Sequence, residues 1–158
     1  MLVRSYQRKV YGLVRKMVID HDDADDITQE VFIKVHKAID NFREDSQLYT
    51  WIFRIATNES LTFLNKKRKR FFFSVEDVGK ELSVKIDMAP SLDGDEIQKK
   101  LQKALLTLPD KQRLVFNLKY YEEMPYEKMA AVTGTSEGAL KASYHHAVKK
   151  IEEFLKED

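Results

Sequence analysis

The spacing of apolar residues along almost the whole chain restricts the fold more than any other feature. They recur at steps of three and four, the pattern of helices that each bury one face. In the first half this predicts helices around residues 10–18, around 27–39 and from about Tyr49 onward. No segment alternates with a period of two for long enough to form a strand. The sequence therefore predicts an all-α fold.

The chain is predicted to form two small helical domains joined by a linker. Residues 71–94 lose the helical period and contain the turn formers Pro90 and Gly94, and residues 71–100 hold 7 acidic against 4 basic residues. Residues 1–70 hold 14 Lys and Arg against 10 Asp and Glu. We therefore expect a basic domain over 1–70, an acidic linker over 71–94 and a second domain over 95–158. Fully extended, the linker would reach roughly 80 Å.

Several classes of function are disfavoured by what the sequence contains. There is no cysteine, no secretory signal and no run approaching the roughly 20 apolar residues that span a membrane, so we expect an intracellular, cytoplasmic protein. The acidic cluster at 20–26 lacks the glycine and distal glutamate of a calcium loop, and the histidines are poorly spaced for a metal. No phosphate-binding glycine loop or nucleophile motif is present. We expect no enzyme activity, no metal and no cofactor.

The second half contains the pattern of a helix-turn-helix. Pro109 and Pro125 mark helix starts, Gly134 ends a short helix in a left-handed turn, and Thr135 or Ser136 caps the next helix. The early positions of that last helix would then face a DNA major groove. An ordinary helical hairpin explains the same pattern equally well. The residues expected at the groove are Ser136, Glu137, Lys141, Ser143, Tyr144, His145 and His146.

The third helix of the first half has two different faces. Asp22 or Asp23 is expected to cap the helix before it. An apolar stripe of Ile52, Ile55, Ala56 and Phe63 is expected to face inward, and the basic run 66–70 follows. The opposite face could bind single-stranded nucleic acid, with a ring to stack a base, cations for phosphates and amides for base edges. Alternatively, Trp51 is simply a core residue. This face carries Trp51, Arg54, Asn58, Leu61 and Asn65.

Two segments together resemble a known family. DDADDITQEVFIKVHKAIDNFR at 22–43 and TWIFRIATNESLTFLNKKRKR at 50–70 resemble region two of bacterial sigma factors of the sigma-70 family, in the extracytoplasmic-function class. LPDKQRLVFNLKYYEEMPYEKMAAVTGTSEGALKASYHHAVKKI at 108–151 resembles region four of the same class. The resemblance covers nearly the whole chain, in the family's order, with no region three between the segments.

The resemblance implies a transcription initiation factor that binds core RNA polymerase and directs it to promoters. It implies docking of the second helix on the clamp helices of the β′ subunit, contacts of region four with the β flap, and a probable anti-sigma factor as a further partner. The implied polymerase-binding residues are Asp25, Asp26, Gln29, Glu30, Val31 and Phe32. The implied minus-ten residues are Asn41, Phe42, Arg43, Trp51, Arg54, Asn58, Lys66 and Arg68. The implied minus-thirty-five residues are Ser136, Glu137, Lys141, Ser143, Tyr144, His145 and Lys149.

The recognition helix departs from the family at Ser143, His146 and Val148, where many members carry arginines. Phosphate contacts would therefore rest on Lys141, Lys149 and Lys150, with His145 and His146 as further candidates.

Two other classes of protein compete with this interpretation. A free-standing helix-turn-helix regulator would bind duplex DNA as a dimer without polymerase. A helical adaptor would use both faces for protein and bind no DNA. A sigma factor would bind promoters in a way that depends on core polymerase.

Overall fold

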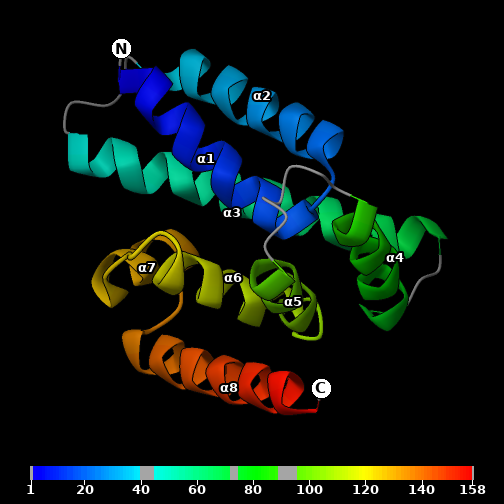
Figure 1. Cartoon of the computed structure of the whole chain (residues 1–158). Coiled ribbons are helices and arrows are strands. Elements are labelled where there is room, and N and C mark those ends of the chain that lie inside the picture. Colours follow the sequence, from blue (N-terminus) through cyan, green and yellow to red (C-terminus); the bar gives the residue numbers. More distant parts are fainter. Residues whose placement is uncertain (1, 40–44, 72–74, 89–95, 158) are drawn as a thin grey trace.

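The computed structural model describes residues 2–39, 45–71, 75–88 and 96–157, and among these residues the regular elements are helices, with no strand. The expected all-α fold is confirmed. Figure 1 shows the arrangement of the helices. Their bounds are α1 Leu2–Val18, α2 His21–Ala38, α3 Asp45–Phe71, α4 Val75–Met88, α5 Glu96–Leu105, α6 Asp110–Tyr120, α7 Tyr126–Thr133 and α8 Glu137–Lys156.

A tight turn joins α1 to α2 and corrects the expected helix cap. Ile19 adopts a left-handed φ of 69°, which ends α1 and leaves Asp20 in an extended conformation. The carboxylate of Asp20 then accepts a hydrogen bond from the backbone N–H of Asp23 at 3.1 Å. The cap is therefore Asp20, while Asp22 and Asp23 lie in the first turn of α2, where their charge suits the positive end of the helix dipole.

The buried stripe of α3 differs in part from the predicted one. Ile52 and Ala56 are buried as expected, but Ile55 and Phe63 are only half-buried. Phe53 and Leu64 occupy the core instead, both with no exposed surface. Because α3 packs on α1 and α2 on one side and on α6 and α7 on another, its buried face is wider than a single stripe of apolar residues indicates.

Part of the predicted linker is a helix. α4 occupies Val75–Met88 and buries Leu82 and Ile86 in the same apolar cluster as the first three helices. Its charged side chains also pair with the first half: Lys67 lies 2.9 Å from Glu81, measured between Nζ and Oε1. The expectation of an extendable linker over 71–94 was therefore wrong for α4, where Leu82 and Ile86 are buried against the first half. Pro90 and Gly94 lie outside the described residues.

The second half forms the expected helix-turn-helix. α7 ends at Gly134, whose φ of 74° is left-handed, and whose N–H donates to the carbonyl of Ala130 at 2.8 Å. Ser136 caps α8 by accepting a hydrogen bond from the N–H of Ala139 at 3.2 Å. Phe116 and Ile151 belong to a small apolar core between α5, α6 and α8. The signals at Gly134 and Ser136 are thus confirmed.

The two halves pack directly against each other. α6 contacts α1 and α3, and α7 contacts α3, as Figure 1 shows. A single apolar cluster contains residues of α1 to α4 together with Leu114 and Leu118 of α6 and Met129 of α7. α2 lies on the side of α1 and α3 that faces away from α8 (Figure 1). In this structure the halves are therefore joined by a shared core as well as by the chain between them.

Candidate nucleic-acid interface

The outward face of α8 carries polar and basic side chains from its first turn onward. Glu137, Lys141, His145 and Lys149 are all exposed, and so is Ser136 at the cap. Because α7 and the left-handed Gly134 hold the start of α8 away from the core, this face is free to enter a groove of duplex DNA. The structure therefore brings five of the seven predicted residues onto one accessible surface.

The other two predicted residues of α8 lie elsewhere. Tyr144 is half-buried and its ring stacks on Phe116 with the centroids 5.7 Å apart. Burial raises the pKa of the Tyr144 hydroxyl. Ser143 is also half-buried. The ring of Tyr144 therefore lies against α6 in this structure, apart from the five exposed residues of α8.

Lysine side chains surround one aromatic ring beside this face. The Nζ atoms of Lys119 and Lys141 lie 4.4 Å and 5.7 Å from the ring centroid of Tyr126. Such cation–π contacts hold flexible lysines close to one surface. Positive charge is therefore concentrated where α6, α7 and α8 meet.

The outer face of α3, defined here as Trp51, Arg54, Asn58, Leu61 and Asn65, also lies where the sequence indicated. Arg54, Asn58 and Asn65 are exposed. Trp51 is half-buried and packs against the core cluster. It is therefore partly a core residue, and part of its surface is open to a base. Asn41, Phe42 and Arg43 lie outside the described residues.

Two of the cations predicted to bind DNA contact the second half instead. Arg54 donates to the carbonyl oxygen of Ala131 in α7 from Nε at 3.2 Å and from Nη2 at 2.5 Å. Arg68, which is half-buried, forms an ion pair with Asp110 at the start of α6 and donates to Asn65 at 3.4 Å. Nothing in the sequence pattern of α3 indicated these contacts.

A basic cavity of about 740 Å³ lies at the C-terminal end of α3. Lys66 and Lys69 are exposed there, while the side chain of Lys67 is 11% exposed and pairs with α4. The lining thus contains an aromatic ring, one carboxylate and several cations, a chemistry suited to nucleic-acid phosphates. The lining residues are Asp23, Phe63, Lys66, Lys67, Lys69 and Arg70.

The outer face of α2 is acidic and accessible. Asp25, Asp26, Gln29 and Glu30 are exposed, and the apolar Ile33 beside them is 47% exposed. Asp25 and Gln29 also line a cleft of about 520 Å³ between α1 and α2. In contrast, Phe32 is only 4% exposed and Val31 is fully buried. These two residues are core residues here, because they point from α2 toward α1 and α3, so their predicted place in a docking surface is corrected.

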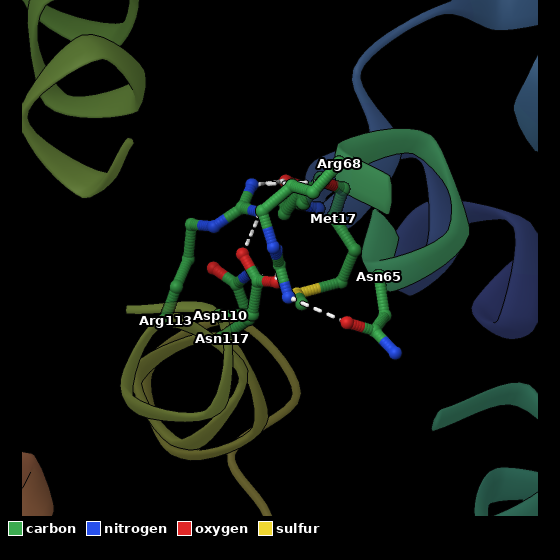
Figure 2. Close-up of polar contacts among 7 residues, drawn as sticks. Met17, Asn65, Arg68, Asp110, Arg113 and Asn117 are labelled. Carbon is green, nitrogen blue, oxygen red and sulfur yellow. Dashed lines mark hydrogen bonds and ion pairs between the residues drawn. The ribbon is translucent and has the colours of Figure 1, made fainter. Parts of the chain in front are cut away.

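A buried polar cluster, which no motif in the sequence indicated, joins the halves. Arg113 of α6 is 2% exposed; its Nη1 donates to the carbonyl of Met17 at 2.8 Å and to that of Lys16 at 3.3 Å. Its Nη2 lies 3.5 Å from Asp110. Asn117, fully buried, donates to the sulfur of Met17 at 3.4 Å. Figure 2 shows these side chains projecting from α6 toward α1 and toward Arg68 of α3. In the sequence, two polar residues at i and i+4 look like an exposed helix face, so the pattern carried no signal of their burial.

The described residues contain no group of three or more His, Cys, Asp and Glu side chains that could hold a metal ion. In the part of the chain that the structure describes, no helix combines the length and apolarity needed to cross a bilayer.

A helix-turn-helix with a basic outward helix, joined to a helical bundle with a second polar face, defines a DNA-binding protein. The sequence matches Sigma-70 region 2 over residues 2–70 and Sigma-70 region 4 over residues 98–151. It is 30% identical to the RNA polymerase sigma-H factor of Pseudomonas aeruginosa, over 98% of this chain and 84% of that protein. It is 29% identical to the ECF RNA polymerase sigma factor SigW of Bacillus subtilis, over 99% of this chain and 88% of that one. The chain belongs to the sigma-70 family of RNA polymerase sigma factors, in the extracytoplasmic-function class.

Solved structures show the same architecture. The sigma factor RpoE in complex with the anti-sigma factor NepR from Bartonella quintana superposes with a TM-score of 0.74 at 25% identity, covering 99% of this chain and 94% of that one. CnrH in complex with the cytosolic domain of CnrY shares the fold with a TM-score of 0.70 at 24% identity, covering 99% of this chain and 86% of that one. The chain is thus a transcription initiation factor, which binds core RNA polymerase and promoter DNA, and not an enzyme.

Proposed function

We propose that this sigma factor uses three separate faces, two to recognise the promoter and one to bind polymerase. The outward face of α8 reads the minus-thirty-five element, the outer face of α3 reads the minus-ten element, and the outer face of α2 docks on the β′ clamp helices of polymerase. The observation that carries this assignment is the exposure of one polar row along α8, from Ser136 to Lys149, immediately after the turn at Gly134.

On α8 the exposed groups supply both base and phosphate contacts. Glu137 can accept a hydrogen bond from the amino group of a cytosine, and His145 offers a ring nitrogen to a base edge. Lys141 and Lys149 provide charge for phosphates, with Lys119 at the edge of the same surface. Tyr144 acts in this proposal by supporting α8 against Phe116, not by touching DNA.

On α3 the groups suit bases of an opened strand. Trp51 offers part of a ring for stacking, and Asn58 offers an amide to a base edge. The exposed Lys66 at the end of the same helix supplies charge for the backbone. Asn41, Phe42 and Arg43 remain predicted contributors to this face on the strength of the family resemblance.

On α2 the proposed docking surface consists of Asp25, Asp26, Gln29 and Glu30. These three carboxylates and one amide are exposed, and α2 lies on the side of the first half that the second half does not cover (Figure 1). The exposed Ile33 adds an apolar contact at the C-terminal edge of an otherwise polar and charged surface. An acidic surface with one apolar anchor suits a basic, partly apolar partner helix.

The assignment is tested by transcription with purified core polymerase and matched variants. On α8, Lys141→Ala should reduce transcription from promoters with a minus-thirty-five element, whereas Lys156→Ala at the far end of α8 should not. On α3, Trp51→Ala should impair strand opening, detected by permanganate footprinting, more than initial duplex binding, whereas Thr62→Ala should change neither.

On α2, Glu30→Lys should weaken binding to core polymerase, whereas Glu153→Lys, which makes the same charge change on exposed α8, should not. Equal effects of any variant and its control would overturn the assignment of that face.

We propose further that residues 1–70 and 95–158 act as two functional units, and that the chain works in the cytoplasm, where core polymerase and promoters are found. An anti-sigma factor is a proposed partner, because structures that share this fold contain sigma factors bound by such proteins. Affinity purification of the chain from its host, with core polymerase as the internal reference, tests for this partner.

A further inference from the structure

The basic cavity at the C-terminal end of α3 has the size of a small-molecule site. Its volume of about 740 Å³ falls within the roughly 300 to 1,000 Å³ that such sites occupy. The first turn of α2 contributes Asp23 to the lining, and α3 contributes the other lining residues. α3 packs on both α2 and α4, and α4 lies beside this end of α3 (Figure 1). The cavity therefore lies where three packed helices meet.

The lining carries a surplus of positive charge. It contains four cationic side chains against one carboxylate. One of the cations, Lys67, is already compensated, because its Nζ lies 2.9 Å from Oε1 of Glu81 in α4. Lys66 and Lys69 are exposed, so their ammonium groups are open to an anion from solution. Such a surplus suits a ligand with several negative charges close together, which is the chemistry of a polyphosphate.

An aromatic ring forms the apolar part of the same lining. Phe63 is half-buried and packs against the core cluster, while it also lines the cavity. A ring held in this way can stack on a flat aromatic group of a ligand, and nucleic-acid bases are bound in this manner. Inorganic phosphate would make no use of the ring. The lining therefore fits a phosphorylated ligand that also carries a base.

The carboxylate of Asp23 indicates which base. Burial and the neighbouring Asp20 raise the pKa of the Asp23 carboxyl, so this group has lost hydration and gains from N–H donors. Its carboxylate is not needed for the helix cap, which uses the backbone N–H of Asp23. The two carboxylate oxygens can accept from two adjacent donors. Guanine offers such a pair, its N1–H and its 2-amino group, whereas adenine places an acceptor beside its amino group.

We propose that this cavity binds a guanine nucleotide that carries two or more phosphates. The base stacks on Phe63 with its donor edge toward Asp23. The phosphates lie among Lys66, Lys69 and Arg70. Of these residues only Lys66 is shared with the proposed minus-ten face, so this inference does not rest on the proposed function, and either can fail without the other.

Isothermal titration calorimetry of the full chain with three probes tests the ligand class. The probes are guanosine triphosphate, adenosine triphosphate and inorganic triphosphate, titrated in the same buffer. We expect guanosine triphosphate to bind most tightly and inorganic triphosphate most weakly, because only the first uses the ring, the carboxylate and the cations together. Absence of binding by guanosine triphosphate would overturn the inference. Equal affinity for all three probes would overturn it as well, because the cavity would then be a general anion site.

Matched variants test the ring and the charge. Phe63→Leu should weaken binding of guanosine triphosphate by about 5-fold to 150-fold, the range for loss of one base–aromatic stack, whereas Phe63→Tyr, which keeps a ring, should bind nearly as the natural chain does. Lys69→Glu should weaken binding by about 10-fold or more. Its control is Lys156→Glu, because Lys156 is also exposed in the last turn of a helix, at the far end of α8. Equal effects within either pair would overturn the inference, and far-UV circular dichroism checks that each variant keeps its helices.

Asp23→Asn tests the choice of base. An amide offers one donor and one acceptor in place of two acceptors, so the preference for guanosine over adenosine triphosphate should fall toward 1. An unchanged preference would overturn the assignment to guanine.

A single-stranded oligonucleotide of thymidine alone distinguishes the nucleotide from DNA, because it has phosphates and bases but no guanine. If Phe63→Leu and Lys69→Glu weaken binding of this oligonucleotide while guanosine triphosphate does not bind the natural chain, the cavity is part of the DNA-binding surface and the inference is wrong. Binding of guanosine triphosphate that depends on Phe63, Lys69 and Asp23 supports it.

Discussion

Replacing Arg113 by alanine is expected to lower the free energy of unfolding by about 3 kcal/mol or more. The change removes the donor for the carbonyls of Lys16 and Met17, and each buried acceptor left without a partner costs about 1 to 3 kcal/mol. Asp110 keeps Arg68 as a partner, so the total should lie near the lower end of the roughly 3 to 5 kcal/mol that breaking a buried ion pair costs.

Urea unfolding followed by far-UV circular dichroism measures this loss. With a slope of about 1 to 3 kcal/mol per molar urea, the midpoint should fall by roughly 1 to 3 M. Lys111→Ala is the matched control, because Lys111 lies two residues before Arg113 on the exposed side of α6. It should change stability by less than about 0.5 kcal/mol. A loss below about 1 kcal/mol for Arg113→Ala would refute the reasoning, because it would mean that the guanidinium is hydrated and does not cap α1.

Four further predictions concern single residues. Gly134→Ala should destabilise the chain by roughly 1 to 2 kcal/mol because its φ of 74° is left-handed, although nothing lies within 4 Å of an added methyl group. Gly138→Ala, in helix α8 and equally unobstructed, should instead stabilise it by about 0.5 to 1 kcal/mol; thermal unfolding that gives both the same sign would contradict this. Phe53→Ala should cost about 3 to 5 kcal/mol in urea unfolding, since Phe53 has no exposed surface, and a loss below 1 kcal/mol would remove it from the core. Burial raises the pKa of Glu122, so the contribution of this side chain to stability is greatest below about pH 4.5 and is lost as the pH rises. The free energy of unfolding of Glu122→Gln should therefore gain on that of the natural chain from pH 4.5 to pH 7. A difference in stability that stays constant over this range would be the contrary result.

Local signals in the sequence predicted most of the second half correctly. Gly134 and Ser136 each act through their own backbone or side chain, so a left-handed turn and a helix cap follow from residue type alone. Exposure along α8 was predicted less well, because the spacing of its apolar residues does not define the edges of the side that faces α6. Tyr144 therefore appeared to be a DNA contact, whereas it stacks on Phe116.

Long-range contacts were beyond what the sequence pattern could predict. Arg113 and Asn117 look like surface residues in an amphipathic helix, and their burial depends on where the end of α1 lies in space. Similarly, α4 forms because Leu82 and Ile86 find an apolar surface on the first half. Both the end of α1 and the apolar surface under α4 are formed by residues distant in the sequence, so the local pattern of α6 or α4 does not predict them. Phe32, whose place in a docking face was implied by the family resemblance alone, is 4% exposed in this structure.

Sequencing of transcription start sites from a promoter library, with purified core enzyme in the presence and absence of the protein, shows whether this chain gives core RNA polymerase its choice of promoter. We expect a defined set of start sites that appears only when the protein is added and that is preceded by common minus-ten and minus-thirty-five sequences. No new start sites, together with a shift of duplex DNA by the protein alone, would contradict it.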